Sequence, residues 1–157
     1  MIFDDIAAFA EAAQTGASLV GLDLGTKTIG VAASDILWQV ASPVETLKRR
    51  KFGVDAEALL AIVEDRAASG LILGLPRNMD GSEGPRAQAT RAFAKNLSAR
   101  TPLPIGFWDE RLSTVAAERA LLEADTSRAR RAEVIDAVAA GFILQGALDR
   151  LGHLRNG

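Results

Sequence analysis

The chain has 157 residues, of which 48% are hydrophobic and 24% charged, and its net charge is −2. This length and composition are typical of one globular domain, which excludes a two-domain enzyme, a fibrous protein and a disordered tail. Because the chain contains no cysteine, disulfide scaffolds, thiolate metal sites and cysteine nucleophiles are excluded as well.

The first residues carry acids, at Asp4, Asp5 and Glu11, where an export signal carries basic residues. No segment reaches the roughly 20 apolar residues that a membrane span needs. We therefore expect a soluble, cytoplasmic protein that does not contact a membrane. The slight acidic excess weakens a nucleic-acid-binding hypothesis, but basic residues gather locally at 48–51 and 128–131. Each basic run is interpreted either as a solvated loop or as a contact with nucleic acid.

The order of the predicted elements indicates a mixed α/β sheet. Apolar residues at helical spacing predict a short amphipathic helix over 2–13. Two apolar runs, 18–24 and 28–34, predict antiparallel strands joined by a tight turn. The elements predicted after them are a strand around 40–46, a helix over 55–68, a strand over 71–75, an exposed loop over 76–85, a helix over 86–99, a strand over 104–108, a helix from 113 or 114 to about 124, and a helix over 130–151.

Strands cluster first and then alternate with helices, which predicts a sheet with helices on both faces. We find no repeat or Pro/Ser-rich linker that would divide the chain into separate domains. The predicted organisation is a single domain over 18–152, preceded by an N-terminal helical extension over 1–17.

Three acidic positions stand out because of their apolar surroundings. Asp23 lies inside the apolar strand 20–25, where an ionised carboxylate is costly without a partner, unless it only caps the following turn. Asp109 and Glu110 follow the strand 104–108, and acids at strand ends commonly face water. Asp136 lies on an apolar helix whose neighbouring alanines allow close packing against the sheet.

Carboxylates from a first strand, a later strand end and a C-terminal helix suit Mg²⁺, which prefers oxygen ligands. Such ions activate water and stabilise the leaving oxygen of a phosphodiester, which is nuclease chemistry. The residues alone do not decide between Asp109 and Glu110, nor do they establish that the acids meet in space.

Four ordered motifs resemble those of the YqgF/RuvX family, which contains Holliday-junction resolvase-like proteins and nucleases that mature pre-rRNA. The motifs are GLDLGTKTIGVAASD over 21–35, GLPRNMDGSEG over 74–84, DERLST over 109–114 and IDAVAA over 135–140. The resemblance spans about 19–151. It implies an RNase H-like fold, with three antiparallel strands followed by two parallel ones. Two departures from the family pattern are Thr28, where the family often has Arg, and Arg77, where an apolar residue is common.

The resemblance further implies cleavage of phosphodiester bonds with Mg²⁺ or Mn²⁺, with Asp23, Glu110 and Asp136 as the catalytic residues and metal ligands. It selects Glu110 over Asp109. The residues that we expect to contact the substrate are basic side chains near these acids and polar residues of the loop after 75, namely Lys27, Asn78, Asp80, Gly81, Arg86, Arg111 and Arg130. Plain salt bridges are the competing interpretation of the basic residues.

The expected partner is nucleic acid, either the 5′ end of pre-16S rRNA, which we favour, or a four-way DNA junction. A junction cutter needs two active sites and hence a homodimer, whereas an RNA nuclease can be a monomer. Ribosomal subunits or processing factors are further expected partners. The competing functions are a non-catalytic ribosome-assembly or nucleic-acid-binding module and an ATP-binding phosphotransferase, since the segment 23–27 also resembles the phosphate loop of actin-like and sugar-kinase proteins.

Overall fold

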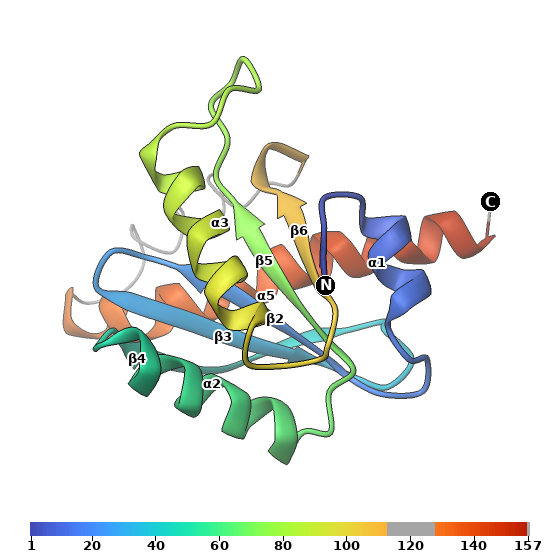
Figure 1. Ribbon diagram of the computed structural model, residues 1–157, viewed down its shortest axis with the longest axis horizontal. Helices are drawn as coiled ribbons and strands as arrows, with labels where there is room; N and C mark the ends of the chain where they lie inside the picture. The colour runs from blue at the N-terminus through green and yellow to red at the C-terminus, as the bar shows by residue number, and fades with distance from the viewer. Residues whose placement is uncertain (113–127, 157) are drawn as a thin grey trace.

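A single six-stranded sheet forms the centre of the molecule, in the order β1-β6-β5-β2-β3-β4 (Figure 1). The computed structural model describes residues 1–112 and 128–156, with the backbone alone for 128–135 and 156. The elements are β1 (Ile2–Phe3), α1 (Ile6–Ala12), β2 (Leu19–Leu24), β3 (Thr28–Ser34), β4 (Ala41–Lys48), α2 (Phe52–Asp65), β5 (Gly70–Leu75), α3 (Pro85–Ser98), β6 (Ile105–Asp109), the 3₁₀ turn η1 (Glu110–Leu112) and α5 (Arg128–Asn156).

The strand directions agree with the sequence-based fold. β2, β3 and β4 are consecutive antiparallel neighbours, while β5 and β6 run parallel to β2. All residues of β2 and β5 are buried, as their nearly unbroken apolar runs predict for central strands. The mixed sheet with three antiparallel and two parallel strands is therefore confirmed. The helix predicted from 113 or 114 lies outside the described residues.

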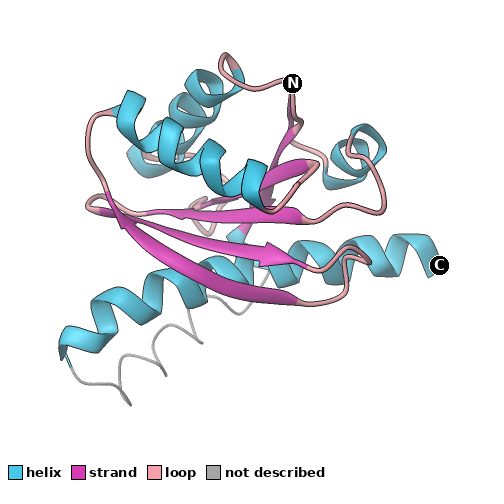
Figure 2. Cartoon of the chain, turned by 90° about the horizontal axis from the view of Figure 1, so that it is seen from below, coloured by secondary structure: helices cyan, strands magenta, loops and turns pink. Residues whose placement is uncertain are grey.

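Helices cover both faces of the sheet, as predicted (Figure 2). On one face α2 and α3 bury Leu59 and Phe93 against side chains such as Leu22 and Leu73. On the other face α1 and α5 bury Phe9 and Leu144, among others. Within the described residues no helix is long and apolar enough to span a membrane.

The N-terminal prediction is wrong in part. Ile2 and Phe3 are not helical: they form β1, a short parallel strand that pairs with Ile105 and Gly106 of β6. The helix begins only at Ile6, after Asp5, whose side chain accepts a hydrogen bond from the backbone N–H of Ala7. The apolar spacing over 2–13 is compatible with a helix, but residues 2 and 3 instead pair with the edge strand β6.

The long helix α5 crosses the sheet close to the strands because glycines lie beneath it. A Cβ on Gly21 of β2 would lie 2.7 Å from the Cβ of Leu144. Ala139 and Ala140 of this helix face are almost fully buried, as their small size predicts. The helix begins at Arg128, so the second basic run is helical and is not the solvated loop of the simpler interpretation.

Candidate active site

Asp23 is the next-to-last residue of β2, and glycines occupy the neighbouring strands beside it. It is 9% exposed and pairs across the ladder with Gly30 of β3. On its other side Leu22 pairs with Leu73 of β5, so the same register continued by one residue places Gly74 beside Asp23. Glycine on both sides leaves space above the sheet around this carboxylate.

Asp136 occupies the space above Gly30. A Cβ on Gly30 would overlap the backbone carbonyl of Asp136, so only glycine allows α5 to approach here. The hydroxyl of Thr28 donates a 2.5 Å hydrogen bond to Oδ2 of Asp136. This bond fixes the orientation of the carboxylate at the end of the sheet where Asp23 lies. The role of Thr28 was not predicted from the sequence, which marked this position only as a departure from the family pattern.

The side chain of Ile143 fills most of the space above Gly74, and Glu110 lies at its border. Its carboxyl carbon is 3.3 Å from the position that a Cβ on Gly74 would take. Glu110 directly follows β6 and begins η1, which turns the chain at the carboxyl end of the sheet. The neighbouring Asp109 forms an ion pair in which the guanidinium of Arg111 lies 2.7 Å from its Oδ2. The two acids that the residues alone left undecided therefore have distinct surroundings.

The three acids thus lie at the same end of the sheet, on the face covered by α5. Among the described residues, no three His, Cys, Asp or Glu side chains are arranged as ligands of one metal ion. The donors nevertheless fit a hard cation in their chemistry, because all three are carboxylates. Holding one ion would require the side chains to turn toward one another.

The loop between β5 and α3 lies next to this end of β6. Asn78 donates a 3.0 Å hydrogen bond to the hydroxyl of Ser82, and the backbone N–H and hydroxyl of Ser82 both donate to Asp80. These bonds lower the pKa of Asp80 below its ordinary value. Gly81 has a φ of +89°, a conformation that favours glycine, and it lies against the Arg111 guanidinium. The three predicted loop residues, Asn78, Asp80 and Gly81, are thereby organised with Ser82 into one compact turn.

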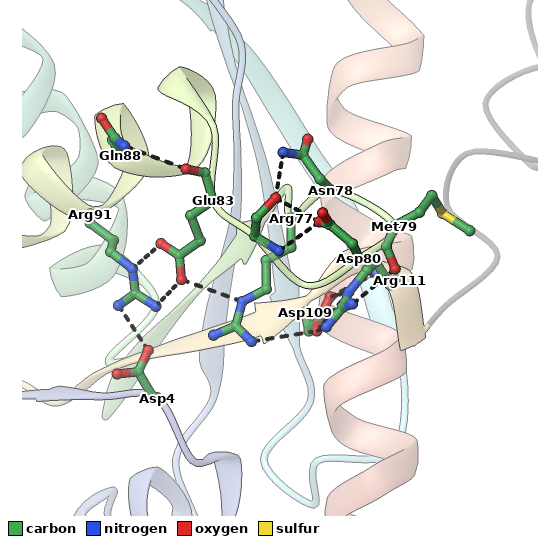
Figure 3. A network of polar contacts seen from close by, with 11 residues as sticks. Asp4, Arg77, Asn78, Met79, Asp80, Glu83, Gln88, Arg91, Asp109 and Arg111 are labelled. Carbon is green, nitrogen blue, oxygen red and sulfur yellow. Dashed lines mark hydrogen bonds and ion pairs between the residues drawn. The ribbon is translucent and has the colours of Figure 1, made fainter.

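A set of ion pairs, here called the loop network, connects this loop to its surroundings (Figure 3). It consists of Asp4, Arg77, Glu83, Arg91, Asp109 and Arg111. Arg91 contacts both Glu83, at 2.5 Å, and Asp4, at 2.8 Å. Hydrogen bonds from Arg91 hold the pKa of Glu83 below its usual range. Each arginine of the network therefore has at least one carboxylate partner.

Arg111 belongs to this network and lies beside Glu110, as predicted. Its hydrogen bonds to Asp109 lower the pKa of that carboxyl and raise the pKa of the guanidinium. It also donates to the backbone carbonyl of Met79 at 3.4 Å. These contacts are the salt bridging that the sequence analysis weighed against a role in substrate binding.

The other predicted basic residues differ in their surroundings. Lys27 is exposed in the turn between β2 and β3. Arg86, in the first turn of α3, donates a 3.0 Å hydrogen bond to the backbone carbonyl of Leu24. Arg130 lies in α5, in the part of the helix whose side chains are outside the described residues. Arg49 was not singled out, although it belongs to the first basic run, and it donates a 2.7 Å hydrogen bond to the carbonyl of Gly25.

The sheet order and the acid positions define the class of the protein, an α/β protein with an RNase H-like fold. Among solved structures, Thermus thermophilus RuvC in complex with a Holliday junction substrate aligns with a TM-score of 0.54 at 11% identity, covering 87% of this chain and 96% of that chain. A second Thermus thermophilus RuvC structure aligns with a TM-score of 0.52 at 13% identity, covering 86% and 96%. At this identity the similarity shows the fold.

The chain belongs to the RuvX family, whose model, described as Holliday junction resolvase, matches residues 17–150. A relative from Paracoccus denitrificans is 71% identical over 154 residues, covering 98% of each chain. A relative from Ruegeria sp. strain TM1040 is 67% identical over 156 residues, covering 99% of each chain. Both relatives bear the name "Putative pre-16S rRNA nuclease". The resemblance found in the four sequence motifs is thereby confirmed.

Proposed function

We propose that this protein is a metal-dependent nuclease that cleaves a phosphodiester bond near the 5′ end of pre-16S rRNA, with the cytoplasm as its compartment. The observation that carries the proposal is the placement of Asp23, Glu110 and Asp136 around one end of the sheet. The glycines at 30 and 74 make room there for the Asp136 backbone and the Glu110 carboxyl group. The name shared by full-length relatives supports pre-16S rRNA as the substrate.

In this proposal Asp23, Glu110 and Asp136 hold Mg²⁺ or Mn²⁺, which supplies an activated water and stabilises the leaving oxygen. The chain's own residues position these ligands. Asp23 is fixed by the central strand, and the hydroxyl of Thr28 orients Asp136. Asp23 is buried among apolar residues, where an unpaired negative charge is costly, and a bound cation would compensate this charge.

The same proposal assigns contacts with the RNA backbone to basic groups at this end of the sheet. Lys27 is exposed in the turn that follows β2, and Arg86 donates to the carbonyl of Leu24 just before this turn. The other proposed substrate contacts are the loop residues Asn78, Asp80 and Gly81 and the basic residues Arg111 and Arg130. For Arg111, binding RNA would compete with its ion pair to Asp109.

The test is cleavage of matched substrates, a pre-16S rRNA 5′ leader and a four-way DNA junction, with Mg²⁺ or Mn²⁺. Asp23→Asn preserves the size of the side chain and removes its charge, so we expect cleavage to fall by roughly 10²–10³-fold, as when a group that stabilises transition-state charge is lost. Asp65→Asn, at the exposed end of α2, is the matched control and is expected to cleave like the unaltered protein.

The two substrates separate the proposed function from its alternative. Symmetric cutting of the junction, with the RNA left intact, would identify a resolvase, as the description of the family model suggests. Equal activity of Asp23→Asn and the unaltered protein would remove Asp23 from the catalytic residues. If neither substrate is cut but RNA is bound, the protein is a non-catalytic binding module.

A further inference from the structure

A pocket of about 250 Å³ lies on the α3 side of the turn between β2 and β3. It is lined by residues 24–26 of the turn, by Arg49 after β4, and by Pro85, Arg86, Ala89 and Thr90 of α3. Its volume is below the roughly 300–1,000 Å³ of pockets that enclose drug-sized ligands. The pocket therefore suits a small group, such as one phosphate, better than a whole nucleoside triphosphate.

The charges among the described residues that line this pocket are all positive. Arg49 and Arg86 are its only charged lining residues, and neither makes an ion pair within the described part of the chain. Each guanidinium has five N–H groups, and each makes one described side-chain hydrogen bond, to the carbonyl of Gly25 or of Leu24. Two uncompensated cations with unused donors favour the binding of an anion.

Several contacts hold these donors in place before any ligand binds. The backbone N–H of Arg49 donates to the carbonyl of Lys27 at 2.9 Å, which joins the basic run to the turn. The Arg49 guanidinium lies over the Phe93 ring, 5.6 Å from its centroid. Arg86 lies in the first turn of α3, whose N-terminus has no side-chain cap and carries a partial positive charge. The pocket is thus preorganised for a negative group.

The pocket and the acids lie on opposite sides of one short turn. Gly25, which lines the pocket, follows Asp23 by two residues, so their Cα atoms are at most about 7.6 Å apart. We propose that Arg49 and Arg86 form a second phosphate site, which holds a backbone phosphate of the RNA next to the one that is cleaved. This inference rests on the proposed function and adds Arg49 to its substrate contacts.

The competing explanation is structural, because both arginines donate to carbonyls at the end of β2 and could serve only to hold that strand end. Binding of single-stranded RNA, measured in EDTA across a salt series, distinguishes the two. Removing one phosphate contact lowers the salt slope by about 0.7 for single strands. We expect this decrease in Arg49→Ala and in Arg86→Ala, and about twice the decrease in the double variant.

Arg100→Ala is the matched control, since Arg100 is also exposed and lies over a phenylalanine ring, that of Phe52, but outside the pocket. Its salt slope is expected to equal that of the unaltered protein. Arg49→Lys should retain most of the slope because it keeps the charge. Thermal unfolding of each variant shows whether any loss of binding reflects loss of structure.

Each outcome decides one of the two proposals. An unchanged slope in Arg49→Ala and Arg86→Ala, with cleavage by the unaltered protein intact, overturns the second phosphate site and leaves the nuclease in place. A lowered melting temperature with an unchanged slope assigns the arginines to the strand end. Lowered slopes in a protein that cuts neither RNA nor junction DNA support the phosphate site and refute the nuclease.

Discussion

Two groups of arginines lie at the same end of the sheet, and they differ in their partners. Arg77, Arg91 and Arg111 of the loop network each contact at least one carboxylate. Among the described residues Arg49 and Arg86 make no ion pair: both donate to backbone carbonyls, Arg49 also lies over the Phe93 ring, and the described lining of their pocket contains no acid. The comparison separates arginines whose charge is compensated by a carboxylate, which organise a loop, from two that have no carboxylate partner among the described residues and that we propose bind a phosphate.

The largest expected effect is a loss of RNA affinity when the charges of Arg49 and Arg86 are reversed. The double variant Arg49→Glu/Arg86→Glu should bind single-stranded RNA roughly 100-fold more weakly at low salt, on the order of tenfold for each reversed charge. Fluorescence anisotropy with a labelled oligonucleotide measures this change. Arg100→Glu, outside the pocket, serves as the control for net charge. Equal losses in the control would show that the effect is not local to the pocket.

A smaller effect, on stability, is expected in the loop network. Arg91→Ala removes the contacts with Glu83 and Asp4 and the stacking on Phe107, whose ring centroid is 5.0 Å from the guanidinium. We expect the free energy of unfolding to fall by about 1–2 kcal/mol in urea. Arg86→Ala is expected to change it by less than about 0.5 kcal/mol. A larger loss of stability in Arg86→Ala than in Arg91→Ala would contradict the division of the arginines into a structural and a phosphate-binding group.

The smallest expected effect is a loss of stability when the pH is lowered. The pKa values of Glu83 and Asp109 are held below their ordinary values, 4.5 and 3.8, by Arg91 and Arg111. A lowered folded-state pKa contributes stability above the ordinary value, and this contribution is lost as the pH falls through the folded-state value. The melting temperature should therefore decrease below about pH 4.5, and less so in Glu83→Gln, whose side chain does not titrate. Parallel curves for the two proteins would show that Glu83 contributes nothing to this decrease.

Much of the fold follows from patterns that are local in the sequence. The apolar runs of β2 and β5 and the glycines around Asp23 indicate a buried first strand with an unusual acid, and the alanines around Asp136 indicate a closely packed helix. Ile2 and Phe3 were assigned to a helix because their partner, β6, lies about a hundred residues away. A strand of two residues has no periodicity that would identify it.

The sequence predicts the acidic residues of the candidate site better than its basic residues. An acid inside an apolar run, such as Asp23, is conspicuous from the sequence. Arg49 belongs to a run of four basic residues, and its contacts with Gly25, Lys27 and Phe93, which the sequence does not show, distinguish it from the others. By contrast, nothing local indicates that Thr28 donates to Asp136, 108 positions later.

The pairing of β1 with β6 affects the order in which the molecule can assemble during synthesis. Ile2 is synthesised about a hundred residues before its partner Ile105, and α5 follows later still. Closing so long a loop slows folding, because the chain must be ordered before the contact stabilises it. Asp136 reaches its place above Gly30 only when α5 has docked. A chain in which α5 has not yet docked therefore displays Asp23 without Asp136, so the proposed site is incomplete until this helix is in place.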